Sequence, residues 1–269
     1  SSSSVLIYAE TGAGKEVFAQ SIHYCGLRKN KPFIPINCAA IPATLLEGML
    51  FGTEMGAFTG AVKKKGLFEE ANHGTILLDE VNSLEPYLQS KLLRVLQEGG
   101  IRHVGGSKVI DIDVRIIATL NEKPEKLLES GKLRKDFYYR LGVMKINIPP
   151  LRQRKEDIPI FVEEIIHNYN SSLGKNITGI DEDMMKKLLE YNWPGNIREL
   201  RNVIEAAINM ADDNSILSQD YFDYIINNKN SNINFANVKN MVSNLDEKLV
   251  LGNYMSYIEK EIIKEMLSK

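Results

Sequence analysis

Short runs of apolar residues alternate with segments of helical periodicity over the first half of the chain. A helical pattern begins at about Lys15, and the apolar runs occupy residues 5–8, 33–37, 75–79, 114–118 and 143–148. Strands that are apolar on both faces and separated by helices are typical of a covered parallel sheet. The pattern therefore predicts an α/β domain in which helices flank a parallel sheet.

The pattern changes after Pro149 and Pro150. Apolar positions then recur at helical spacing, with no strand-like run between them, over residues 161–169, 183–191 and 196–211. Amphipathic helices without strands bury their apolar faces against one another. We therefore expect an α/β domain over residues 1–149 and a small all-helical domain over residues 150–227.

The last part of the chain has a different composition. Residues 227–240 are dense in Asn, Ser and Lys, whereas residues 254–267 are amphipathic. Segments rich in Asn and Ser favour turns and bury little apolar surface. Residues 228–269 are accordingly predicted to be a linker followed by the start of a further domain, and the absence of an initiating Met leads us to expect a fragment.

Composition excludes several classes of protein. The 269 residues are 43% hydrophobic and 25% charged with a net charge of −2, so the basic excess expected of a nucleic-acid-binding domain is missing. Two cysteines, Cys25 and Cys38, are too few for a disulfide framework. No apolar run reaches membrane-spanning length, and the first residues do not resemble a signal peptide. We therefore expect a cytoplasmic protein without a membrane segment.

A glycine-containing segment joins the first predicted strand to the first predicted helix. It reads Ala9, Glu10, Thr11, Gly12, Ala13, Gly14, Lys15 and Glu16. Backbone N–H groups and the helix dipole at such a turn can hold polyphosphate, while Lys15 reaches the β and γ phosphates. Ala9 replaces the usual leading glycine, and Glu16 replaces the hydroxyl residue that usually meets Mg²⁺. The alternative is an ordinary strand-to-helix turn.

Two carboxylates follow the apolar run at residues 75–79. Asp79 ends that run and Glu80 comes next. Open parallel sheets bind ligands at the carboxyl ends of their strands. Asp79 can hold Mg²⁺ there, directly or through water, and Glu80 can polarise a water that attacks the γ phosphate. The alternative is a solvated acidic turn.

A second glycine-containing segment lies between these two motifs. Its sequence is Gly56, Ala57, Phe58, Thr59, Gly60 and Ala61. The glycines permit a tight reversal that leaves Phe58 and Thr59 at the tip, where an exposed aromatic side chain indicates a binding partner. The alternative is a hairpin whose Phe58 folds back into the core. The hexapeptide GAFTGA resembles the signature loop of the sigma-54-dependent activators, which belong to the AAA+ ATPase superfamily.

The resemblance implies a fold, a reaction and partners. The fold is a P-loop AAA+ domain, a parallel sheet flanked by helices, followed by a small all-α lid. The reaction is hydrolysis of ATP with Mg²⁺. The partner is the sigma-54 RNA polymerase holoenzyme, engaged by residues 56–61, and the chain is expected to form a hexameric or heptameric ring. DNA binding belongs to a domain missing from this chain.

Further residues receive roles only through this resemblance. Asn37 is similar to a switch residue that holds Glu80 until the γ phosphate is sensed, and its alternative role is to cap a turn. Asn121 matches the first sensor, although Leu120 stands where many relatives have Thr.

Three arginines also match family positions. Arg134 and Arg140 resemble arginine fingers that reach the neighbouring subunit's nucleotide, and Arg198 resembles the second sensor. A salt-bridged surface arginine is the alternative for one of the two fingers. Asn196 can cap the helix that starts there, with Glu199 as a capping-box partner.

Other features leave alternatives open. Residues 101–104 and 109–115 flank a Gly-Gly-Ser turn and predict a hairpin, which is either the family's second projecting loop or a plain surface hairpin. His23, His73, His103 and His167 lack the spacing of a metal or triad site, so we assign them no catalytic role. A different AAA+ motor, and a nucleotide-binding scaffold without hydrolysis, are the two rival functions.

Overall fold

The computed structural model describes residues 3–58 and 60–228, and within them a five-stranded parallel sheet forms the centre of the first domain. Its strand order is β2-β3-β6-β1-β7. The strands are β1 (Val5–Tyr8), β2 (Phe33–Asn37), β3 (Thr75–Asp79), β6 (Arg115–Leu120) and β7 (Met144–Asn147). The predicted parallel sheet is therefore confirmed, with two of its strands displaced by one or two residues.

Helices cover both faces of the sheet because side chains alternate along each strand. Val5 and Ile7 of β1 pack with Ala19 on one face, whereas Leu6 joins the core that contains Leu50 and Leu92 on the other. The helices of this domain are α1 (Lys15–Tyr24), α2 (Ala43–Phe51), α3 (Leu67–Glu70), α4 (Pro86–Glu98), α5 (Pro124–Glu129) and α6 (Lys135–Leu141). A 3₁₀ turn, η1 (Val81–Ser83), follows β3.

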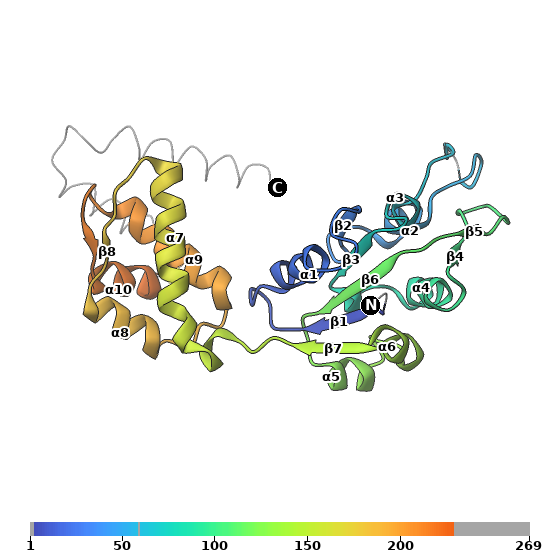
Figure 1. Ribbon diagram of the computed structural model, residues 1–269. Coiled ribbons are helices and arrows are strands. Elements are labelled where there is room, and N and C mark those ends of the chain that lie inside the picture. Colours follow the sequence, from blue (N-terminus) through green and yellow to red (C-terminus); the bar gives the residue numbers. More distant parts are fainter. Residues whose placement is uncertain (1–2, 59, 229–269) are drawn as a thin grey trace.

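The second domain packs helices around Trp193. The indole is fully buried, donates a 2.8 Å hydrogen bond from Nε1 to the Leu188 carbonyl, and meets Tyr191 and Phe222 edge-on. The elements are η2 (Leu151–Gln153), η3 (Lys155–Asp157), α7 (Ile158–Leu173), α8 (Glu182–Glu190), α9 (Asn196–Met210) and α10 (Gln219–Asn228). Figure 1 shows this domain beside the sheet domain, joined by the segment that follows β7.

The prediction that no strand interrupts these helices was wrong in one detail. Strands β8 (Gly179–Ile180) and β9 (Ile216–Leu217) form a short parallel pair. Two-residue strands carry no periodicity, so the sequence pattern cannot reveal them. The linker predicted to start at residue 228 begins too early by that residue, since Asn228 ends α10, and the rest of the predicted segment, residues 229–269, lies outside the described residues.

Two loops project from the sheet domain. The output loop, residues 52–66, contains the GAFTGA sequence, and the neighbouring hairpin joins β4 (Gly100–Ile101) to β5 (Ile110–Asp111). Figure 1 shows both loops side by side at the end of the sheet domain farthest from the helical domain. The predicted hairpin is confirmed, although its strands are shorter than the apolar pattern indicated.

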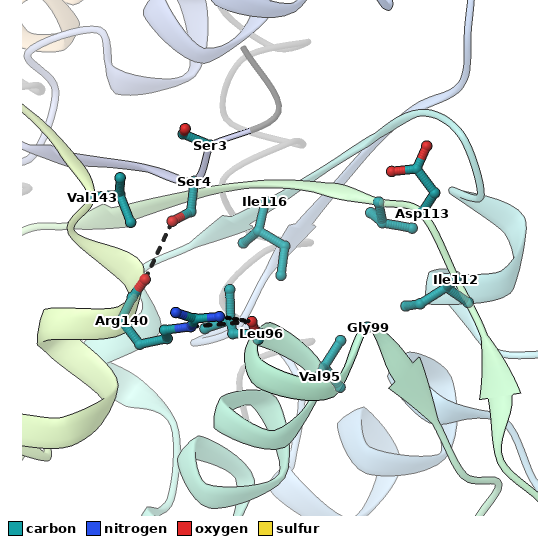
Figure 2. Close-up of a pocket in the computed structure, with 11 residues that line it drawn as sticks. Ser3, Ser4, Val95, Leu96, Gly99, Ile112, Asp113, Ile116, Arg140 and Val143 are labelled. Carbon is teal, nitrogen blue, oxygen red and sulfur yellow. Dashed lines mark hydrogen bonds between the residues drawn. The ribbon is translucent and has the colours of Figure 1, made fainter.

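A cavity of about 330 Å³ lies where the strands begin, at the edge of the sheet opposite the loop that follows β1. Ser3, Ser4 and Val143 line it together with the last turns of α4 and α6. Figure 2 shows the Arg140 guanidinium in this cavity, donating to the Leu96 carbonyl. The end of α6 is thereby attached to the end of α4.

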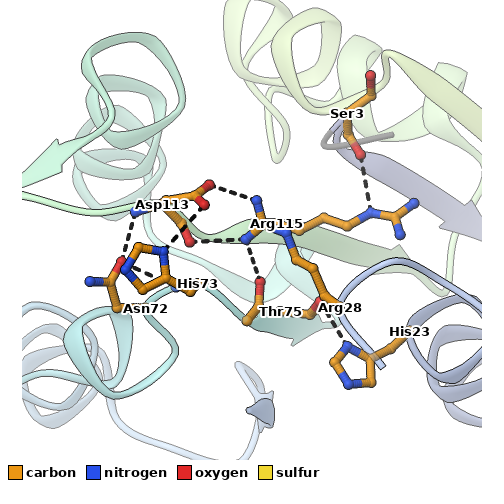
Figure 3. Close-up of polar contacts among 9 residues, drawn as sticks. Ser3, His23, Arg28, Asn72, His73, Thr75, Asp113 and Arg115 are labelled. Carbon is orange, nitrogen blue, oxygen red and sulfur yellow. Dashed lines mark hydrogen bonds and ion pairs between the residues drawn. The ribbon is translucent and has the colours of Figure 1, made fainter. Parts of the chain in front are cut away.

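Beside this cavity a polar network ties the strand starts together (Figure 3). Arg28 donates to the carbonyl oxygens of Gly74 and Asp113 and forms a 2.6 Å ion pair with the Asp113 carboxylate. Asp113 also faces His73 at 3.5 Å. The guanidinium adds a second hydrogen bond to each of two carbonyl oxygens that already accept from the N–H groups of Arg115 and His73. Among residues 3–58 and 60–228, no helix has both the length and the apolar character needed to span a bilayer.

Candidate active site

The carboxyl ends of the strands bring the sequence motifs to one edge of the sheet. The segment at residues 9–16, the phosphate loop, follows β1, and Asn37 ends β2. Asp79 ends β3, and Asn121 follows β6. This edge is where open parallel sheets bind ligands.

The phosphate loop bends sharply before α1. Gly12 and Gly14 have φ angles of 79° and 97°, which side chains rarely tolerate. The Lys15 side chain is buried, and its ammonium donates to the carbonyl oxygens of Ala9 (3.1 Å) and Glu10 (3.4 Å). The start of α1 thus presents backbone N–H groups and a cation on the same loop, as an anion site requires.

Four charged groups lie within electrostatic reach of one another here. Burial lowers the pKa of Lys15, the carboxylates of Asp79 and Glu80 oppose that shift, and Arg198 adds to it. The residues of the phosphate loop and of the β3 end therefore share one electrostatic environment, although 63 or more residues separate them in the sequence.

The two departures from the common phosphate-loop pattern have different surroundings. Ala9 is completely buried and its N–H donates to the Leu120 carbonyl, so its methyl group is accommodated in the core. The Glu16 side chain is exposed and accepts a hydrogen bond from Gln20, one turn further along α1. The carboxylate of Glu16 is therefore directed along the helix surface.

Thr119 connects the two acids, and sequence reasoning missed it. Its hydroxyl donates to the Asp79 carboxylate at 2.5 Å and accepts from the Glu80 N–H at 2.9 Å. Glu80 has a φ of 57°, a left-handed conformation that costs energy and is concentrated at functional sites. A polar residue near the end of an otherwise apolar strand was the available signal.

Two asparagines at this edge bond to other side chains, and for Asn37 the contact differs from the predicted one. The Asn37 amide donates to Asp79 at 3.3 Å rather than to Glu80, and its oxygen accepts from the N–H groups of Ala39 and Ala40. The predicted contact with Glu80 is therefore corrected, because the turn after β2 points the amide at the end of the adjacent strand β3. Asn121 accepts from Asn82 at 2.9 Å.

Arg134 and Arg140 are exposed and bind groups of their own chain away from the phosphate loop. Arg134 precedes α6 and pairs with Asp136 at 2.7 Å. Arg140, near the other end of α6, donates to Leu96 at 2.8 and 3.1 Å in the cavity of Figure 2. Because that cavity lies at the opposite edge of the sheet, Arg140 is remote from the phosphate loop of its own chain.

The helical domain touches the phosphate loop directly through its first arginines. Arg152 forms a two-bond pair with Glu10, both contacts at 2.7 Å, which lowers the pKa of Glu10. Arg154 donates to the Ala13 carbonyl at 2.8 Å. Neither arginine carried a recognisable motif, because the contacts join residues more than 140 positions apart.

Asn196 reinforces this contact. It is fully buried, has a φ of 54°, accepts from the Leu151 N–H and donates to the Thr11 carbonyl at 3.0 Å. The prediction that Asn196 caps α9 was wrong, since Gly195 holds the capping position. Glu199 does accept from the Gly195 N–H at 2.7 Å, so that half of the predicted arrangement is present.

The turn before α9 also lies against the phosphate loop. A Cβ atom added to Gly12 would lie 2.2 Å from the Gly195 carbonyl oxygen, and the Arg198 N–H donates to the Gly12 carbonyl at 3.3 Å. Arg198 is thereby fixed by its backbone beside the phosphate loop, while its side chain is exposed. A side chain at residue 12 would therefore clash with the helical domain, whereas one at residue 195 would meet Glu199 of its own domain.

Replacing Thr119 with Val is expected to lower the free energy of unfolding by about 1–3 kcal/mol, because the Glu80 N–H loses its buried acceptor. The reorientation of Glu80 should also reduce the ATP turnover expected from the sequence motifs by about tenfold, equivalent to raising the barrier by roughly 1.4 kcal/mol. Denaturant unfolding and phosphate release measure the two effects. The Thr119→Ser variant retains the hydroxyl and serves as the control; an equal loss there would show that the methyl group matters instead.

The sheet topology, phosphate loop, paired acids and helical lid together define a AAA+ domain. The family described as "Sigma-54 interaction domain" matches residues 1–147, and the one described as "AAA+ ATPase lid domain" matches residues 152–237. The chain therefore belongs to the AAA+ family of sigma-54-dependent transcription activators.

Individual relatives agree with this assignment. The transcriptional activator RocR of Bacillus subtilis is 52% identical over 223 residues, which is 83% of this chain and 48% of RocR. NtrX from Brucella abortus, solved in complex with ADP, is 36% identical with a TM-score of 0.76, covering 82% of this chain and 49% of NtrX. The chain thus spans about half the length of the relatives it matches.

Proposed function

We propose that this domain hydrolyses ATP to ADP and phosphate and uses the reaction to remodel the closed complex of sigma-54 RNA polymerase, allowing an open complex to form. The observation that carries the proposal is that one sheet domain has both features: an edge that carries the phosphate loop with Asp79 and Glu80, here called the nucleotide edge, and an exposed GAFTGA loop. A different AAA+ motor needs the first of these features but not the second.

The residues of the sheet edge fit a nucleotide and a Mg²⁺ ion. Lys15 and the N–H groups that begin α1 provide positive potential for the phosphates. Asp79 provides the carboxylate oxygens that Mg²⁺ prefers, held in place by Thr119 and Asn37. When bound, Mg²⁺ would neutralise charge on the β and γ phosphate oxygens. Solved structures of NtrX in complex with ADP and with ATP support nucleotide binding at this fold.

Glu80 is proposed as the group that polarises the attacking water. The left-handed backbone of Glu80 and the hydrogen bond from its N–H to Thr119 fix the position at which its side chain leaves the end of β3. Asn37, whose amide donates to the neighbouring Asp79, is proposed to respond to the γ phosphate. Asn121 and Arg198 are proposed as the sensors on the sheet and lid sides.

Arg134 and Arg140 are proposed to complete the site of a neighbouring subunit. Planar guanidinium groups suit the oxygens of a transferring phosphoryl group. The position of Arg140 at the far edge of the sheet supports a role in trans, because it cannot serve the phosphate loop of its own chain without rearrangement. Hydrolysis then requires a ring, hexameric or heptameric as the family implies.

The tip of the output loop supports contact with a protein partner. Phe58 is 57% exposed and Met55 is 82% exposed. Gly56 and Gly60 have φ angles near 80°, and a Cβ atom added to either would meet nothing within 4 Å. Exposed apolar side chains on a projecting loop indicate an interaction site. Thr59, the proposed polar contact with sigma-54, lies outside the described residues.

Replacing Thr59 with Ala tests the proposal. Loss of a central contact with sigma-54 should reduce open-complex formation by about tenfold or more, equivalent to about 1.4 kcal/mol. Phosphate release should continue, because the output loop projects from the end of the sheet domain farthest from the helical domain, which contacts the phosphate loop. Open complexes are counted by transcript yield from a sigma-54 promoter, with Thr59→Ser as the matched control. Full transcript yield from Thr59→Ala would exclude the proposed contact.

A further inference from the structure

One buried histidine at the base of the output loop is held between two carboxylates. His103, in the β4–β5 hairpin, faces Glu54 through Nδ1 at 2.9 Å and Glu69 through Nε2 at 2.7 Å. Its side chain is only 7% exposed. Glu54 lies in the arm that enters the GAFTGA sequence, and Glu69 lies in α3, directly after the returning arm. The imidazole therefore connects three segments that are distant in the sequence.

The protonation state of His103 follows from these partners. A neutral imidazole carries one N–H donor and one acceptor nitrogen, whereas an imidazolium carries two donors. An ionised carboxylate can only accept. Both contacts can form at once only when the ring is protonated, so the arrangement of Glu54, His103 and Glu69 is that of an imidazolium ion.

The surrounding backbone shows that the same place joins the output loop to the hairpin. The Glu54 N–H donates to the Val104 carbonyl at 3.0 Å, and the Val104 N–H donates to the Gly52 carbonyl at 2.9 Å. A Cβ atom added to Gly52 would lie 2.8 Å from His103 Cδ2. The imidazole therefore fills the space that Gly52 leaves, directly over these bonds.

We propose that protonated His103 is the positioning residue that holds both arms of the output loop against the β4–β5 hairpin, and that its deprotonation loosens the loop and weakens its grip on the protein partner. The loosening rests on the loop geometry alone. Its effect on a partner rests on the proposed function.

The charges around His103 fix the direction of the pH dependence. The hydrogen bond that His103 donates to Glu69 is the largest cause that raises the pKa of His103, burial opposes it, and the hydrogen bond to Glu54 raises it further. Lys63 pairs with Glu54 at 3.1 Å. A second cavity, separate from that of Figure 2, lies beside the ring, and its charged lining residues are Lys91, Arg94 and Glu98 of α4 and Arg102 of the hairpin. Because the folded pKa lies above the ordinary value of about 6.5, the clamp is complete below that value. It is lost as the pH rises through the raised pKa.

Trypsin cleavage of the full chain after Lys63, Lys64 and Lys65 reports on the loop without any partner. The Lys64 backbone bonds to Thr53 in both directions at 2.9 Å, so cleavage there requires the arms to open. Rates are compared with those of His103→Gln at each pH, which cancels the pH dependence of trypsin itself. At about pH 6 the wild-type loop should be cut about tenfold more slowly than the His103→Gln loop, and the two rates should converge by about pH 9.

Two further variants separate a charge effect from loss of folding. His103→Arg keeps a permanent cation, so its cleavage after residues 63–65 should be slower than that of His103→Gln by the same factor at every pH. Glu69→Gln keeps the shape of the partner and should move the wild-type transition to lower pH. Equal cleavage of wild type and His103→Gln at about pH 6, or a ratio that does not change with pH, would overturn the proposal.

Transcript yield per ATP hydrolysed then tests the effect on the partner. The ratio of wild-type to His103→Arg yield should fall over the same pH interval as the cleavage contrast. A cleavage contrast without this fall would overturn the effect on the partner and leave the Thr59→Ala test of function unaffected. A cleavage contrast with the fall supports both parts.

Discussion

ATP turnover by a Glu80→Gln variant should be about 10² to 10⁴ times slower than wild type, the usual contribution of a positioned general base. Gln has nearly the same size and can still accept hydrogen bonds, but it cannot take a proton from water. The backbone bond between Glu80 and Thr119 does not involve the carboxylate, so the fold should be retained. Phosphate release measures turnover, and binding of a fluorescent ATP analogue should change by no more than a few-fold.

Glu85→Gln provides the matched control. This variant makes the same chemical change five residues further on, where the Glu85 side chain is exposed and makes no capping hydrogen bond. It should leave turnover unchanged. Equal and negligible turnover by wild type and Glu80→Gln would instead favour a nucleotide-binding scaffold, and undiminished turnover by Glu80→Gln would assign the water to another group.

Loss of Arg140 should lower ATP turnover by at least a comparable factor. An arginine finger contributes about 10³ to 10⁵ in turnover, so Arg140→Ala should lower phosphate release by about 10³ or more. Among residues 3–58 and 60–228, the exposed side chain of Arg140 donates hydrogen bonds to the Leu96 carbonyl alone, and truncation should therefore change the melting temperature little. Phosphate release and thermal unfolding are the two measurements.

Mixing two inactive variants tests whether Arg140 acts in trans. Each boundary between neighbouring protomers in the ring is called a seam here. At a seam between an Arg140→Ala protomer and a Glu80→Gln protomer, the nucleotide site is complete when the first protomer supplies Glu80 and the second supplies Arg140. About one seam in four is of this kind in a random equal mixture of a cyclic ring. Activity of the mixture far above that of either variant would support completion between protomers, whereas no increase, or full activity of strictly monomeric wild type, would contradict it.

The parts of the site that are continuous in the chain could be predicted from the sequence. The phosphate loop occupies eight consecutive residues, and Asp79 and Glu80 are adjacent at the end of an apolar run. A parallel sheet brings all carboxyl ends of its strands to one edge. The shared edge therefore followed from the parallel arrangement of the strands, without knowledge of any side-chain contact.

Contacts between distant segments could not be predicted in the same way. The pair of Glu10 and Arg152 spans 142 positions, and Asn196 reaches Thr11 over 185. Asn196 looked like a helix cap because Asn commonly occupies that position after a turn. In the structure the side chain of Asn196 instead forms a tertiary hydrogen bond with the phosphate loop.

His103 shows the same limitation for charge. Four scattered histidines without metal spacing carried no signal, because the two carboxylate partners of His103 lie 49 and 34 positions away. Thr119 was hidden by the apolar residues around it, although it bonds to both acids of the neighbouring strand. Knowledge of which strands are neighbours would have identified it.

The chain contains one tryptophan, Trp193, and it lies at the centre of the helical domain. Its ultraviolet emission is therefore a native fluorescent probe of that domain and is insensitive to packing among the strands. The indole is held in its buried position by the hydrogen bond to Leu188 and by ring contacts with Tyr191 and Phe222. Its emission should therefore move to longer wavelength when the helices separate. Unfolding of the lid can thus be followed separately from unfolding of the sheet, without attaching a dye.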